Sequence, residues 1–251
     1  PADGGLHRHR RGHDDNRAGV SGLRERVVRI APSVMCVDLM RMGEGLALVE
    51  QGGADLLHWD VMDGVFVPNL TFGAHFVNAA GERCRLPFDV HLMVTNPMLQ
   101  VEQLRLRGGD LVTFHVSAAK DFAALTSAIA GSGCGWGVAL NPDRPLEEVL
   151  NEPVLEGCSL ILVMSVFAGF AGQDFIPESL ERIRQVAQHP LVRERGITVA
   201  VDGGITAENA AAVVAAGARL LVSGSYLLHP SVDFPARLQL LRQAAEKGLS
   251  R

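Results

Sequence analysis

Lysine is almost absent from this sequence. Only Lys120 and Lys247 occur among 251 residues, and both fall within or at the ends of predicted helices. Schiff-base aldolases and lysine-dependent decarboxylases need a lysine at the active site. These classes are therefore disfavoured, and any catalytic chemistry has to come from other side chains.

Paired cysteines and long apolar runs are lacking as well. The four cysteines are scattered, without a CxxC pair, which indicates reduced and mostly buried thiols. No apolar run approaches the roughly 20 residues that span a bilayer, and there is no secretory-type leader. We therefore expect a cytoplasmic protein without a membrane partner.

The net charge disfavours nucleic acid as a partner. With a formal charge of −5 and an isoelectric point near 6.0, the chain lacks the basic surface that binds polyanions. A histidine and arginine cluster occurs only at residues 7–13, without an apolar period. We expect residues 1–28 to form a disordered extension and residues 29–251 to form a single catalytic domain.

From Arg29 onward, short aliphatic runs alternate with longer amphipathic stretches about eight times. This alternation predicts repeated βα units and a parallel sheet. The predicted strands cover residues 30–33, 54–61, 86–93, 111–116, 135–140, 160–163, 197–202 and 220–223. The predicted helices cover residues 41–51, 74–80, 98–107, 122–130, 146–150, 176–188, 207–216 and 232–246.

Such a repeat could close into a (β/α)8 TIM barrel or open into a doubly wound sheet. The first strand is not followed by GxGxxG, the fingerprint of many doubly wound folds. Charged and glycine-rich segments instead follow the strands throughout, where barrel enzymes carry their catalytic residues. The sequence therefore favours a single-domain TIM barrel.

Metal-capable side chains stand near the ends of three predicted strands: His58 and Asp60, His91, and Asp202. Residues two apart in a strand project to the same side, so His58 and Asp60 face the same way. Closure of the barrel would bring the four side chains together. Two imidazoles and two carboxylates form a mixed N/O set that suits Zn2+, Fe2+, Mn2+ or Co2+.

The two aspartates predict a reaction as well as a site. Two carboxylates at a barrel mouth can face both sides of a flat intermediate, so that one removes a proton and the other returns one. A carbon acid is far weaker than a carboxylic acid, so an aspartate base succeeds only if the enediolate oxygens are stabilised, and a divalent cation can supply that stabilisation as a Lewis acid. Asp60 and Asp202 therefore indicate an epimerisation.

Glycines gather in the loops after the last three predicted strands. Such loops form the recurrent phosphate site of these barrels, where backbone N–H groups hold the anion. We expect a phosphorylated ligand in contact with Gly169, Phe170, Ala171, Gly172, Gly203, Gly204, Gly224 and Ser225.

Eight segments together resemble the ribulose-phosphate 3-epimerase family, in the family's order and spacing. They are IAPS at 30–33, HWDVMDG at 58–64, FVPN at 66–69, DVHLMV at 89–94, MSV at 164–166, GFAGQ at 169–173, VDGGI at 201–205 and SGS at 223–225.

The resemblance implies a TIM barrel that interconverts D-ribulose 5-phosphate and D-xylulose 5-phosphate through a 2,3-enediolate. It implies one divalent metal ion, with Zn2+ and Fe2+ foremost, on His58, Asp60, His91 and Asp202, and Asp60 and Asp202 as the acid/base pair. It also implies a homo-oligomer and further substrate contacts from Ser33, Met62, His91, Met93 and Met164.

The sequence departs from the family pattern at two places. Val65 stands where the family has a histidine, and Phe167-Ala168 stands where Asn-Pro is common. Residues 32–39, 91–95 and 170–173 look closer to the allulose-6-phosphate 3-epimerase branch, so a six-carbon ketose phosphate is the alternative substrate. A metal-independent barrel isomerase or decarboxylase and a non-catalytic sugar-phosphate-binding protein are rivals of other classes.

Three polar residues remain as secondary candidates. Asp63 could orient the turn after the second strand, and Asp89 could support the ligand set from behind, because it shares a side with His91. His115 could either approach the substrate or only pack and hydrogen-bond.

Overall fold

The computed structural model describes residues 27–250. Its eight strands form one parallel sheet in the order β1-β8-β7-β6-β5-β4-β3-β2. The end strands β1 and β2 meet at a bridge between Ser33 and His58, so the sheet closes on itself. The strands are β1 Arg29–Pro32, β2 Leu57–Met62, β3 Phe88–Met93, β4 Leu111–His115, β5 Gly135–Leu140, β6 Leu160–Met164, β7 Thr198–Asp202 and β8 Leu220–Ser223.

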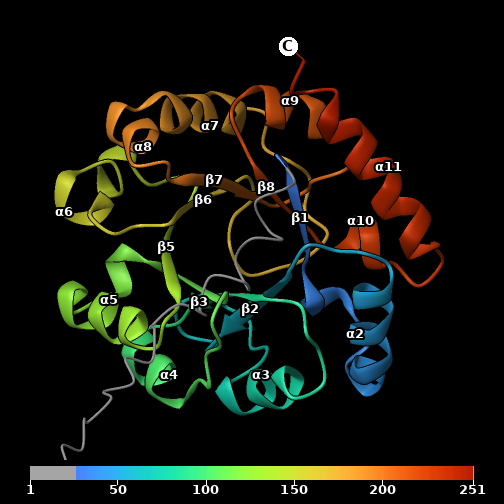
Figure 1. The fold of residues 1–251 in the computed structure, drawn as a ribbon, viewed down its shortest axis with the longest axis horizontal. Coiled ribbons are helices and arrows are strands. Elements are labelled where there is room, and N and C mark those ends of the chain that lie inside the picture. The colour runs from blue at the N-terminus through green and yellow to red at the C-terminus, as the bar shows by residue number, and fades with distance from the viewer. Residues whose placement is uncertain (1–26, 251) are drawn as a thin grey trace, which may run out of the picture.

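Helices form a ring around the strands, as Figure 1 shows. The α-helices are α2 Met42–Gln51, α3 Ala74–Gly81, α4 Pro97–Gln103, α5 Phe122–Gly131, α6 Glu152–Leu155, α7 Ser179–Gln188, α8 Pro190–Glu194, α9 Ala210–Ala215, α10 Ser225–Leu228 and α11 Phe234–Glu246. Short 3-10 helices are η2 Val34–Cys36, η3 Leu39–Arg41, η4 Val116–Ala118 and η5 Leu146–Glu148. This architecture confirms the predicted TIM barrel.

Both faces of the strands are buried, which explains their nearly continuous apolar sequences. In β6, Ile161 and Val163 belong to the large core that also contains helix residues. The alternate residues Leu160, Leu162 and Met164 belong to a smaller cluster made mainly of strand residues. This alternation follows the period of two of a strand and sends every second side chain into the barrel.

The predicted helices that differ most from the structure are those at 98–107 and 146–150. The helix predicted at 98–107 ends at Gln103 because Leu104 is extended and the Arg107 guanidinium is bound by the carbonyls of Cys84 and Leu86. The helix predicted at 146–150 is the short η5. The chain then forms the unpredicted α6, which begins at the N-cap Asn151 and has proline in its first turn.

The predicted N-terminal extension lies almost wholly outside the described residues. Val28, which we placed at its end, is buried in the core. Within residues 27–250, no helix combines the length and the apolar character needed to cross a bilayer.

Candidate active site

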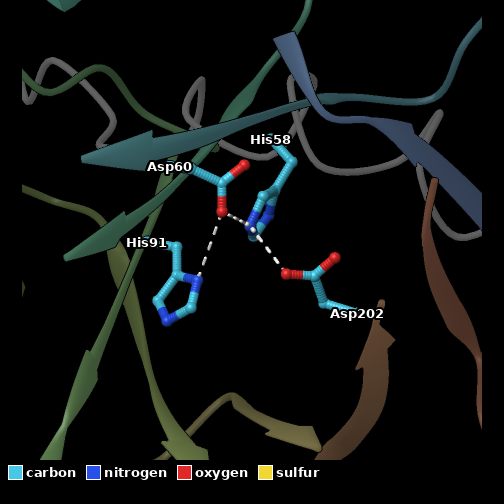
Figure 2. Close-up of side chains that lie close together, drawn as sticks. All are labelled: His58, Asp60, His91 and Asp202. Atoms are coloured by element: carbon cyan, nitrogen blue, oxygen red, sulfur yellow. Dashed lines mark ion pairs between the residues drawn. The ribbon is translucent and has the colours of Figure 1, made fainter. Parts of the chain in front are cut away.

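Four side chains from three strands converge inside the barrel, as Figure 2 shows. His58 and Asp60 come from β2, His91 from β3 and Asp202 from the end of β7. Each offers one ligand atom, and these atoms all lie within 4.8 Å of one another. The separation is small enough for a single ion to contact all four residues.

Two unpartnered nitrogen atoms face this cluster. The Nε2 atom of His58 and the Nδ1 atom of His91 are buried and have no hydrogen-bond partner among the described residues. Nε2 of His58 lies 3.3 Å from Oδ1 of Asp60 and 3.8 Å from Oδ2 of Asp202. Nδ1 of His91 lies 3.7 Å from Oδ1 of Asp60. Buried polar atoms are costly without a partner, so the donor set fits a divalent cation.

The two aspartates differ in their electrostatic surroundings. Burial raises the pKa of Asp60, but the adjacent imidazoles of His58 and His91 lower it by more, so this pKa lies below its usual value. Burial and the negative charge of Asp60 raise the pKa of Asp202 to about 7. A pair of carboxylates with separated pKa values is typical of acid/base sites.

The two histidines differ in the same way. Burial lowers the pKa of His58, but the Asp60 and Asp89 carboxylates outweigh burial and raise this pKa well above its usual value. Burial lowers the pKa of His91, and the neighbouring His58 adds to that effect. A metal ligand must be a neutral imidazole, so cation binding at His58 would release a proton.

A pocket opens above the cluster at the carboxyl ends of the strands. Asp60 and Asp202 line it, whereas both imidazoles are fully buried beneath it. Ser33 also lines the pocket, and its hydroxyl donates to Oδ2 of Asp60 at 2.5 Å. The predicted substrate contacts Met62, Met93 and Met164 are all in the lining.

The predicted phosphate-binding residues also line this pocket. They are Gly169, Phe170, Ala171, Gly172, Gly203, Gly204, Gly224 and Ser225. No lysine or arginine is found among the described residues of this lining. An anion in this pocket would therefore be held by backbone N–H groups and uncharged polar side chains such as Ser225.

Gly203 and Gly204 are required by the geometry of the loop after β7. Both have positive φ angles, of 120° and 62°. A Cβ atom at Gly204 would lie 2.4 Å from the backbone nitrogen of Phe175, and one at Gly203 would lie 2.4 Å from a methyl group of Val166. Only glycine allows this close approach of two loops at the pocket.

The loop that departs from the family pattern is held by side-chain amides. Gln173 donates to the backbone carbonyls of Phe167 and Phe170, both at 2.8 Å. Asn69 donates to the carbonyl of Gly169 at 2.6 Å. Phe167 lines the pocket and is half-exposed, while the other departure, Val65, is exposed outside the lining.

The secondary candidates Asp63 and His115 contact other protein groups and do not line the pocket. Asp63 accepts hydrogen bonds from the backbone N–H groups of Val65, Phe66 and Thr95 and so fixes the turn after β2. His115 is buried beneath the pocket and lies against His91 with 3.0 Å between the two Nε2 atoms. It is not among the lining residues.

Sequence reasoning missed Thr113, a fully buried β4 residue whose hydroxyl donates to Oδ1 of Asp89 at 2.7 Å. Its spacing of two from His115 was the available signal, because it places both side chains on the same face of the strand.

Residues 29–228 match the ribulose-phosphate 3-epimerase family. The chain belongs to this family. It is 40% identical over 229 residues to the ribulose-phosphate 3-epimerase of Chlamydia trachomatis, covering 90% of this chain and 97% of the relative. It is 42% identical over 200 residues to that of Synechocystis, covering 78% and 85%. With the Bacillus subtilis relative it shares 38% identity over 202 residues, covering 79% and 91%.

Solved structures of much lower sequence identity share the barrel fold. KGPDC from Streptococcus mutans superposes with a TM-score of 0.63 at 13% identity and covers 88% of this chain and 99% of that one. N-(5'-phosphoribosyl)anthranilate isomerase from Pyrococcus furiosus gives a TM-score of 0.55 at 16% identity, with 87% and 98% covered. At such identity the likeness concerns the fold alone.

Proposed function

We propose that this protein is a metal-dependent ribulose-phosphate 3-epimerase that interconverts D-ribulose 5-phosphate and D-xylulose 5-phosphate. The observation that carries the proposal is the convergence of two aspartates and two imidazole nitrogens beneath a glycine-lined pocket, in a member of this family. The enzyme class is isomerase.

Asp60 and Asp202 act as the acid/base pair. One carboxylate takes the C3 proton from one face, and the electrons of the C–H bond pass to the C2 carbonyl to give the 2,3-enediolate. The other carboxylic acid returns a proton to the opposite face. Support comes from the position of these two side chains, which line the pocket and also belong to the cluster.

The same carboxylates, with His58 and His91, would hold one divalent ion, and Zn2+ and Fe2+ suit this donor set best. When bound, such an ion supplies a Lewis acid that stabilises negative charge on the substrate oxygens. Ser33 supports Asp60 by donating to Oδ2, which leaves Oδ1 directed toward His58 and His91.

The phosphate group would be held by the loops at residues 169–172, 203–204 and 224–225, and the sugar would lie against the methionines. Methionine side chains adapt to an irregular shape and cannot accept the reactive protons. Their apolar sulfur atoms would exclude water from the planar intermediate.

The experiment that tests the function is a comparison of kcat/KM on D-ribulose 5-phosphate and D-allulose 6-phosphate after metal reconstitution. We expect the five-carbon substrate to be preferred and chelation to abolish turnover. Solvent deuterium should enter at C3. Activity that survives complete chelation would contradict the metal-dependent mechanism, and a preference for the six-carbon substrate would reassign the protein to the allulose-6-phosphate branch.

Two further properties follow from the family and the composition. We propose a homo-oligomer, which light scattering of the purified protein measures. We also propose a cytoplasmic location, supported by four cysteines that are all free thiols in the described structure.

A further inference from the structure

Each imidazole of the candidate metal site has a second nitrogen that is hydrogen-bonded behind the site. For His58 the partner is Asp89, whose Oδ2 lies 2.9 Å from Nδ1. A carboxylate only accepts, so Nδ1 of His58 carries a proton, and Nε2 is the nitrogen that offers a lone pair to a cation once the ring is neutral. That lone pair is on the buried, unpartnered nitrogen that faces the cluster.

Asp89 is itself fixed by β4. The hydroxyl of Thr113 donates to its Oδ1 at 2.7 Å, and the three side chains linked in this way, His58, Asp89 and Thr113, are fully buried. Both oxygens of Asp89 are therefore engaged. The carboxylate has no freedom to turn away from His58 without breaking a buried hydrogen bond.

His91 has the opposite arrangement. Its Nδ1 faces the cluster without a partner among the described residues, and its Nε2 lies 3.0 Å from Nε2 of His115, with the two rings stacked. For Nδ1 to offer a lone pair, Nε2 has to carry the proton and donate it to His115. His115 must then be the tautomer protonated at Nδ1.

Both supporting series of hydrogen bonds end on the same strand. Thr113 and His115 are two residues apart in β4 and project to one side. Asp89 and His91 have the same spacing in β3, which pairs with β4 in parallel register. β4 contributes no ligand to the cluster. Its Thr113 binds Asp89, the partner of His58, and its His115 contacts His91 directly.

We propose that Asp89 and His115 are positioning residues that fix the two metal-binding histidines in opposite tautomers, His58 binding through Nε2 and His91 through Nδ1. The inference rests on the metal site of the proposed function. An ionised partner makes an imidazole a stronger donor to a metal than a neutral partner does, so His58 and His91 are not equivalent ligands.

The direct test uses the Zn2+-loaded wild-type protein. Long-range 1H–15N correlation spectra of the histidine rings report which nitrogen carries the proton. We expect Nδ1–H for His58 and Nε2–H for His91. Protonation of the same nitrogen in both rings would overturn the proposal, and this measurement requires no variant to fold.

The second test is the Zn2+ dissociation constant, measured by competition with a chelator. We expect Asp89→Asn and His115→Phe each to weaken binding about 10–100-fold, the effect of removing such supporting partners. His115→Gln keeps an oxygen that accepts from Nε2–H of His91, and it should bind Zn2+ close to the wild-type value. Equal affinity of His115→Phe and the wild type would overturn the role of His115.

A matched control is Asp110→Asn. Asp110 is also a buried carboxylate, but it binds Arg107 and the backbone N–H of Phe88, away from the cluster. This variant should lose thermal stability and keep its Zn2+ affinity. If it loses affinity as much as Asp89→Asn, general destabilisation explains the result and the proposal is wrong.

The outcomes separate the two levels of inference. A wild-type protein that binds no Zn2+ at the cluster overturns the proposed metal site, and this inference with it. A protein that binds Zn2+ there with matching tautomers in both rings overturns only the present inference.

Discussion

Replacement of Asp202 by asparagine tests the acid/base pair most directly. Asparagine keeps the shape of the side chain and removes its charge and its capacity to take a proton. The main chain at this position is held independently of the carboxylate, because the backbone N–H and the hydroxyl of Ser165 both donate to the carbonyl of Asp202, at 2.8 and 3.0 Å. We therefore expect the variant to fold.

The magnitude follows from the role of the group. Loss of one positioned acid or base lowers kcat by about 10²–10⁴-fold, which corresponds to about 2.7–5.4 kcal/mol of activation free energy. Asp202 also belongs to the candidate metal cluster. Its replacement would remove a metal ligand as well, so the decrease in kcat should be at least as large as this range. Asp60 would remain, held by Ser33, to exchange the C3 proton from one face.

The assay has two readouts. Turnover is measured in both directions, and deuterium incorporation at C3 is measured separately for each epimer in D2O. We expect epimerisation to be lost, while one epimer alone still exchanges its proton. Asp63→Asn is the control, because Asp63 lies at the same rim outside the pocket lining. A kcat for Asp202→Asn within about tenfold of the wild type, with metal retained, would remove Asp202 from the acid/base role.

Three further results are expected. Gly204→Ala should cost at least about 1–2 kcal/mol of unfolding free energy and raise KM, because its Cβ would meet the Phe175 backbone; unchanged urea midpoint and KM would contradict this. Burial raises the pKa of Asp63, but hydrogen bonds from its own turn and the adjacent loop have the larger, opposite effect, so this pKa falls to about 2. Its stabilising effect is therefore present above its unfolded pKa of about 3.9 and lost as pH falls toward 2, so Asp63→Asn should show a flatter dependence of Tm on pH in this window. Arg242→Ala removes one partner of the Asp55 carboxylate, which also accepts a hydrogen bond from the backbone N–H of Ile30, and loss of this charged hydrogen bond should lower the free energy of unfolding by about 1.5–3 kcal/mol, measured by denaturant titration; a loss under about 0.5 kcal/mol would refute it.

Much of the fold could be predicted because its signals are local. The strands at 135–140 and 220–223 have the predicted bounds, since each is a short aliphatic run ended by a polar or turn-forming residue. Asp121 caps α5 by accepting a hydrogen bond from the backbone N–H of Ala124, and an aspartate directly before an apolar stretch is a local signal for the start of a helix. The end of α4 could not be predicted, because it depends on contacts that Arg107 makes with carbonyls distant in the sequence.

The sequence by itself determined which residues share a side of each strand. The period of two places His58 with Asp60 in β2 and Asp89 with His91 in β3, whatever the strands pair with. Only the tertiary structure decided which residues of other strands lie next to these side chains. Pairing in register sets His58 opposite Asp89 and Asp60 opposite His91, and barrel closure brings Asp202 within reach from β7. Register and closure depend on packing along the whole chain, which no single segment encodes.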